Sequence, residues 1–129
     1  MEPKNKYQLD GKRYYPNNHH HTVIAVLTGL DIVDIIDASP LNDHWGGQTF
    51  VKTFNKLGFN TNHRFIKFDR DTIYPCLMRT KRTDIKEPYW YCFPYYDGWV
   101  YFEGYCYGFE YFFAMYNNLR ITSMLQVWI

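Results

Sequence analysis

The sequence predicts an α+β fold in which N-terminal helices pack on a C-terminal antiparallel sheet. Before Gly58 the apolar residues recur with helical spacing, and after it they alternate with the spacing of strands. In addition, the dipeptide Asp97-Gly98 lies between two aromatic strand-like runs, which is a strong hairpin signal. Helices followed by strands are typical of an architecture in which the two kinds of element are segregated.

The first helix is expected from about His19 to Thr28. Its apolar residues lie at positions i, i+3, i+4 and i+7, namely Val23, Val26, Leu27 and Leu30. The same face extends back to His19, so we expect this histidine to point toward the core, while His20 and His21 point elsewhere. Gly29 is a natural residue to end the helix.

Two further helices are expected before Gly58. The segment 31–37, DIVDIID, forms a short helix with Asp31 as its cap. The turn HWGGQTF leads to Thr49, which caps a third helix over residues 50–57. Gly58 ends this helix.

The remaining segments read as strands with one more helix. Strands are expected at RFIKF (64–68), at TIYPCLMR (72–79) with Pro75 weakening its start, and as a hairpin in EPYWYCFPYYDGWVYFEGY (87–105). A short helix, FEYFFAMYNN (109–118), precedes a final strand, LRITSMLQVWI (119–129). We see no repeat or linker, so residues 1–129 are predicted to form a single domain with an N-terminal arm over residues 1–15.

Charge and cysteine content exclude several classes of protein. The formal net charge is +1, which gives no electrostatic indication of nucleic-acid binding. The three cysteines lack the spacing of a zinc site, and the adjacent histidines diverge on a helix, so we expect no metal and no cofactor. The start of the chain is polar and no apolar run reaches ~20 residues, which indicates a cytoplasmic protein without a membrane segment.

Aromatic residues make up 21% of the chain and crowd its second half. A small domain cannot bury so many rings, so we expect some to form a surface that binds another protein. The alternative is that these rings pack within an aromatic-rich sheet. A third possibility is a homo-oligomer formed through the aromatic edge of the sheet. The candidate binding residues are Tyr95, Tyr96, Trp99, Tyr105, Tyr107 and Trp45.

Several short motifs occur in an order that points to a known family. They are Thr28-Gly29, Gly47-Gln48-Thr49 with Leu57-Gly58, Asp97-Gly98 with Val100-Tyr101, and Ile121-Thr122-Ser123. Over roughly residues 15 to 129 this order resembles the compact papain-like cysteine peptidases, in particular the C39-like group. The resemblance implies a papain-like fold, with a nucleophilic cysteine at the start of the first helix, a histidine on one strand and an orienting carboxylate on the next.

This sequence departs from the pattern of that family at each of its three catalytic positions, so we expect the chemistry of the family to be lost. The nucleophile position falls on His19, the base on Tyr91 (or Tyr89 if the register slips), and the carboxylate on Phe102. We therefore expect no catalytic residue, and instead a pseudo-peptidase that binds another protein. The Asn, Lys, Tyr and Phe content is typical of AT-rich genomes, including many phages, so a phage-encoded inhibitor of a host enzyme is one expectation.

The alternative is a divergent papain-like hydrolase that uses His19 with Tyr91 or with a relocated cysteine. Strand alternation places Cys92 on the opposite face from Tyr91, and we expect Tyr91 to face the helices. The helix dipole favours a neutral His19, which is then expected to form a hydrogen bond with the hydroxyl of Tyr91. The positions of His19, Tyr91 and Phe102 therefore decide between the two alternatives: a closed, packed cluster indicates a structural role, and an open cleft indicates an enzyme.

Overall fold

The computed structural model describes residues 19–40, 45–86 and 90–129, so the predicted arm and Tyr89 lie outside the described residues. The helices are α1 (His19–Thr28), α2 (Ile32–Ala38), α3 (Gly47–Lys56) and α4 (Phe109–Met115). The strands are β1 (Asn60–Thr61), β2 (Cys76–Arg82), β3 (Trp90–Tyr96), β4 (Trp99–Phe102), β5 (Tyr105–Gly108) and β6 (Leu119–Trp128). The predicted α+β class is confirmed, and the papain-like arrangement stays a prediction.

The six strands form one antiparallel sheet in the order β1-β6-β2-β3-β4-β5. Strand β2 lies at its centre, with Leu77 opposite Leu125 and Met78 opposite Met124 of β6. Because directly opposed residues share a face, these two pairs mark the two sides of the sheet.

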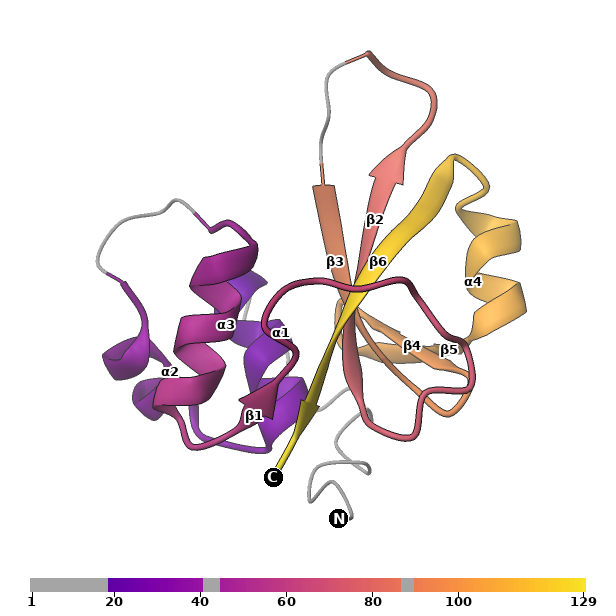
Figure 1. Ribbon diagram of the computed structural model, residues 1–129. Coiled ribbons are helices and arrows are strands. Elements are labelled where there is room, and N and C mark those ends of the chain that lie inside the picture. The colour runs from indigo at the N-terminus through magenta and orange to yellow at the C-terminus, as the bar shows by residue number, and fades with distance from the viewer. Residues whose placement is uncertain (1–18, 41–44, 87–89) are drawn as a thin grey trace.

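Each side of the sheet has its own hydrophobic core. On one side α1, α2 and α3 pack with Leu77, Leu125 and Val127. On the other side Phe112 of α4 packs with Met78 and the rest of a second cluster. Figure 1 shows the two helical groups apart, with α1–α3 beside one side of the sheet and α4 beside the other. The predicted packing of N-terminal helices on the sheet is thus shown in part, because α4 covers the other side of the sheet and adds a layer that the prediction did not contain.

Helix α1 has the predicted bounds but not the predicted single apolar face. All residues from Thr22 to Thr28 are buried. The hydroxyl of Thr28 donates to the carbonyl of Ile24 at 2.8 Å, which satisfies this buried polar group within the helix. Gly29 ends the helix with a φ of 74°, a conformation that favours glycine.

Two tight turns shape the aromatic half of the sheet. The predicted Asp97-Gly98 turn joins β3 to β4, and both residues have positive φ, as a two-residue hairpin turn requires. Glu103-Gly104 repeats this geometry and joins β4 to β5. Strand β5 was not predicted as a separate strand.

Three predicted boundaries are wrong. In RFIKF only Ile66 pairs with the sheet, through a bridge to Met124, and the regular strand is β1. Strand β2 begins at Cys76, directly after Pro75, because proline lacks the donor that the ladder needs. Helix α3 begins at Gly47 instead of after Thr49, whose hydroxyl accepts a bond from the Gly46 N–H at 3.3 Å.

Candidate functional site

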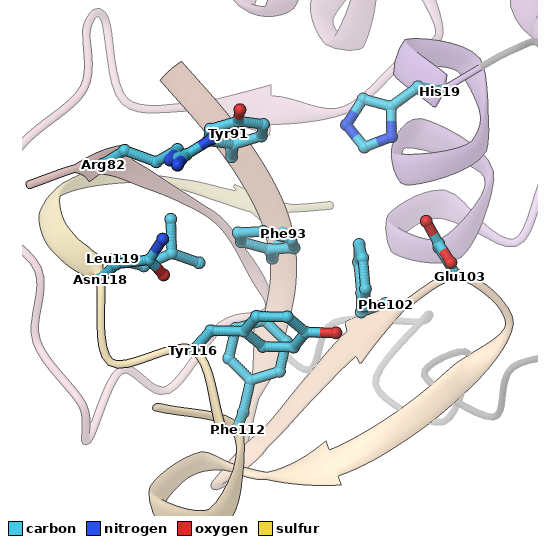
Figure 2. Close-up of a pocket in the computed structure, with 10 residues that line it drawn as sticks. All are labelled: His19, Arg82, Tyr91, Phe93, Phe102, Glu103, Phe112, Tyr116, Asn118 and Leu119. Carbon is cyan, nitrogen blue, oxygen red and sulfur yellow. The ribbon is translucent and has the colours of Figure 1, made fainter. Parts of the chain in front are cut away.

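The three residues that the expected resemblance assigned to catalytic positions, His19, Tyr91 and Phe102, line the same cavity. This cavity, called the aromatic cavity below, has a volume of about 530 Å³. It lies between the start of α1, the strands β3 and β4, and α4 (Figure 2). Its lining is completed by Arg82, Phe93, Glu103, Phe112, Tyr116, Asn118 and Leu119.

Local structure explains why these residues meet. His19 is the first residue of α1, and Phe102 is the last of β4, directly before the Glu103-Gly104 turn. Tyr91 and Phe93 alternate along β3 and both pack with the core on the α4 side. His19 reaches this side from the first turn of its helix, where its side chain is partly exposed at the wall of the cavity and not turned into the core as expected.

Aromatic rings form the floor of the cavity in edge-to-face contacts. The ring of Phe93 lies 5.5 Å from that of Phe102 and 5.1 Å from that of Phe112. Tyr116 lies 5.6 Å from Phe102 in the same kind of contact. These are favourable geometries for aromatic pairs, so each ring restrains its neighbours and the cavity has a firm apolar floor.

Polar groups lie around the cavity at two separate places. At one of them Arg82 Nε donates to Asp84 at 2.9 Å, and the guanidinium lies beside the hydroxyl of Tyr91. The arginine holds the pKa of Asp84 at about 2, and Asn118 supports the same carboxylate. At the other place His19 lies near Glu103 (Figure 2).

The predicted hydrogen bond between His19 and Tyr91 is wrong. The hydroxyl of Tyr91 lies beside the guanidinium of Arg82, and Figure 2 shows His19 apart from it, on the first turn of α1. Burial lowers the pKa of His19, and Glu103 opposes this by raising it, so the imidazole is neutral at neutral pH. His19, Tyr91 and Phe102 therefore line an open cavity and do not fill it.

No described cysteine lines the aromatic cavity. Cys76 is buried in the core, and Cys106 belongs to β5. Cys92 packs against the core of α1–α3, so the expectation that it faces away from these helices is wrong. Tyr91 instead faces away from them and packs with the core on the α4 side. Burial raises the pKa of Cys92 to about 12, which keeps it a thiol and makes it a poor nucleophile.

The run His19–His21 forms an aromatic cluster with Trp45. The ring of His20 stacks on Trp45 at 5.1 Å and meets Phe50 edge-to-face at 5.8 Å. Burial, together with the charges of its two histidine neighbours, lowers the pKa of His20 to about 4. Trp45 is consequently half-buried as a packing partner of the histidines and not an isolated surface residue.

The other predicted binding aromatics do not form one patch. Tyr95 is fully buried, so its predicted place on a binding surface is wrong: its hydroxyl donates to the carbonyl of Arg70 and accepts from the Gly98 N–H. Tyr96 and Trp99 oppose each other on one face of the hairpin. Tyr105 and Tyr107 oppose Phe102 and Val100, on the face that lines the aromatic cavity. Only the second pair is next to the candidate site.

Sequence reasoning missed the polar residues of the cavity. Neither Arg82 nor Glu103 is among the candidate residues predicted from the sequence. The Glu-Gly pair at residues 103–104 was the usable signal, because a residue before glycine between two aromatic runs predicts a turn. Phe112 and Tyr116 had no signal of their own, since their role depends on where α4 packs.

Comparisons with protein-family models, with curated proteins and with solved structures found no match to this chain. Within residues 19–40, 45–86 and 90–129, no three His, Cys, Asp or Glu side chains gather as a metal site does. Of the helices in the same part of the chain, none has the length and apolar character needed to cross a bilayer. The proposals below therefore rest on the residues and geometry of the chain itself.

Proposed function

We propose that this chain is a non-catalytic binding domain, built on a peptidase-like frame, that takes an apolar side chain of another protein into the aromatic cavity. One observation carries the proposal. The positions where that frame needs a cysteine, a histidine and a carboxylate hold His19, Tyr91 and Phe102, and they line a cavity with an apolar floor and a polar rim. Such a site suits recognition of an apolar anchor.

The surface next to the cavity favours a macromolecular partner. Tyr105 opposes Phe102 across β4 and β5 and is 67% exposed. Tyr107, half-buried, stacks on Tyr111 of α4, which is 65% exposed. Exposed rings therefore continue from the cavity along β5 and α4, and this apolar area extends the contact beyond one side chain. Inhibition of a host enzyme stays a prediction about the identity of that partner.

A specific observation favours one competing function, a divergent hydrolase. His19 is neutral and has Glu103 beside it, and a neutral imidazole with a carboxylate neighbour can act as a general base. The cavity does not supply a nucleophile for this mechanism among its described residues: the hydroxyl of Tyr91 lies beside Arg82, and the thiol of Cys92 faces the other side of the sheet.

Selection from a displayed library of random peptides tests the proposal. The wild-type protein should enrich peptides that share an aromatic or aliphatic anchor, and mass spectrometry should recover them intact. The double variant Tyr105→Ala with Tyr111→Ala should bind the enriched peptides at least about tenfold more weakly, since exposed anchor rings contribute about 1–2 kcal/mol each. Trp99→Ala removes a ring of similar exposure, 52%, from the other face and should leave binding unchanged.

Two outcomes would contradict the binding proposal. Equal binding by the wild type and the double variant would show that the aromatic surface next to the cavity is not the contact. Cleavage of the selected peptides by the wild type, lost in His19→Ala, would establish the hydrolase in its place.

A further inference from the structure

A second cavity lies on the other side of the sheet. It has a volume of about 280 Å³ and is called the Arg79 cavity below. The α1 start, the Gly46-Gly47 turn and the strands β2 and β3 surround it, and only His19 is shared with the aromatic cavity. Rings of His20, Trp45, Phe50, Phe65 and Trp90 line it together with Arg79.

Arg79 is held in place by two rings and one hydrogen bond. Its guanidinium carbon lies 4.3 Å from the ring centre of Phe65 and 5.0 Å from that of Trp90. Its Nε donates to the hydroxyl of Ser123 at 3.1 Å. These contacts fix the plane of the guanidinium and lower the entropy cost of binding a ligand through it.

Gly47 allows the backbone to approach the ring of Phe65 and the guanidinium of Arg79 closely. A Cβ on Gly47 would lie 3.3 Å from the ring of Phe65 and 3.8 Å from Nη1 of Arg79. A larger residue would therefore displace the ring against which Arg79 lies. Gly47 therefore preserves the Phe65–Arg79 stack, whereas a Cβ on Gly46 would meet no atom within 4 Å.

The Arg79 cavity carries a net positive charge at neutral pH. Its lining contains no acidic residue within the described part of the chain, and no described carboxylate lies within ion-pair distance of Arg79. The histidines on its wall have lowered pKa values, about 4 for His20, so they are neutral. Arg79 is consequently the permanent charge of the cavity.

We propose that the Arg79 cavity binds a small planar aromatic carboxylate, with the acid group on Arg79 and the ring against Trp45 and Trp90. A flat guanidinium matches a carboxylate in bidentate geometry, and Trp45 and Trp90 in the cavity lining supply aromatic contacts for a planar ligand. The volume is at the lower end of ligand sites, which limits the ligand to one or two fused rings. A cationic ligand is excluded because Arg79 would repel it.

Calorimetric titration of the full chain with indole-3-acetate, and with its neutral amide as a matched probe, tests this site. We expect the acid to bind with a Kd below about 1 mM and at least about tenfold more tightly than the amide. Arg79→Met should remove this preference, and Arg79→Lys should retain part of it, because lysine keeps the charge but lacks the planar fork. Arg120→Met removes an exposed arginine outside the cavity and should have no effect.

A second variant guards against an Arg79 substitution that disturbs the fold. Trp90 is 50% exposed and Trp99 is 52% exposed, so both can be replaced by alanine at low cost to stability. Trp90→Ala should weaken indole-3-acetate binding at least about threefold, because the ring loses a stacking face, while Trp99→Ala should not. The proposal is overturned if indole-3-acetate fails to bind at about 1 mM, or if its amide binds equally well. It is also overturned if Trp90→Ala and Arg79→Met both bind indole-3-acetate like the wild type. Tighter binding of a mononucleotide than of indole-3-acetate would also overturn the assignment to a carboxylate.

Discussion

Acid should destabilise this protein through His20. The folded ring stacks on Trp45, and its pKa is about 4 against an ordinary value of 6.5. The unfolded chain therefore takes up the proton first as the pH falls. The stabilising contribution is complete above pH 6.5, decreases as the pH falls from 6.5 to about 4, and changes no further below that range.

The size of the effect follows from the pKa difference. Each pKa unit corresponds to about 1.4 kcal/mol, so the interval between 6.5 and about 4 sets an upper limit of roughly 3 kcal/mol. Solvent reaches part of the ring and screens the protonated form. We therefore expect His20 to account for a loss of about 1.5 kcal/mol in the free energy of unfolding across this window.

Urea unfolding at a series of pH values, on the wild type and on His20→Phe, measures this loss. Phenylalanine keeps a ring between Trp45 and Phe50 but cannot be protonated, so the variant should lose about 1.5 kcal/mol less on acidification than the wild type. His63→Gln, a change at an exposed histidine, should follow the wild type. Identical acid slopes for the wild type and His20→Phe would refute the reasoning, because His19 and His21 titrate in both.

Three further predictions concern stability and are checked by urea or thermal unfolding. Phe112→Ala removes a fully buried ring from the α4-side core and should cost about 3–5 kcal/mol; a loss below about 1 kcal/mol would show that the core closes over the gap. Gly58→Ala should cost about 1 kcal/mol because φ is +91° there, and Gly58→Asn should cost less. Tyr95→Phe deletes two partly buried hydrogen bonds and should cost about 1–3 kcal/mol, whereas Tyr96→Phe should be close to neutral.

The sequence carried enough information to predict elements whose ends are set by local backbone chemistry. Gly29 and the Asp97-Gly98 pair adopt positive φ. The end of α1 and the turn between β3 and β4 were therefore predicted correctly from these residues alone. The same logic applied to Glu103-Gly104 would have found β5. RFIKF was misread because alternation predicts a strand without saying whether a partner strand is long enough to pair with it.

The candidate site was predictable in position but not in orientation. His19, Tyr91 and Phe102, the three residues singled out from the sequence, line one cavity in the structure. Which face of β3 meets the helices is set by the packing of distant elements, so Tyr91 and Cys92 were assigned to the wrong sides. Tyr95 was misjudged for a related reason: alternation along an aromatic strand does not reveal which face α4 covers.

The place of β6 in the sheet has a consequence for how the protein folds during synthesis. Residues 119–128 pair with β1 on one edge and with β2 on the other, across long sequence separations (Figure 1). Until this segment has left the ribosome, β2 has only β3 as a neighbour and the helical core lacks Leu125 and Val127. The nascent chain therefore exposes an unpaired strand edge and part of both cores, which is the state in which aggregation and chaperone binding compete with folding.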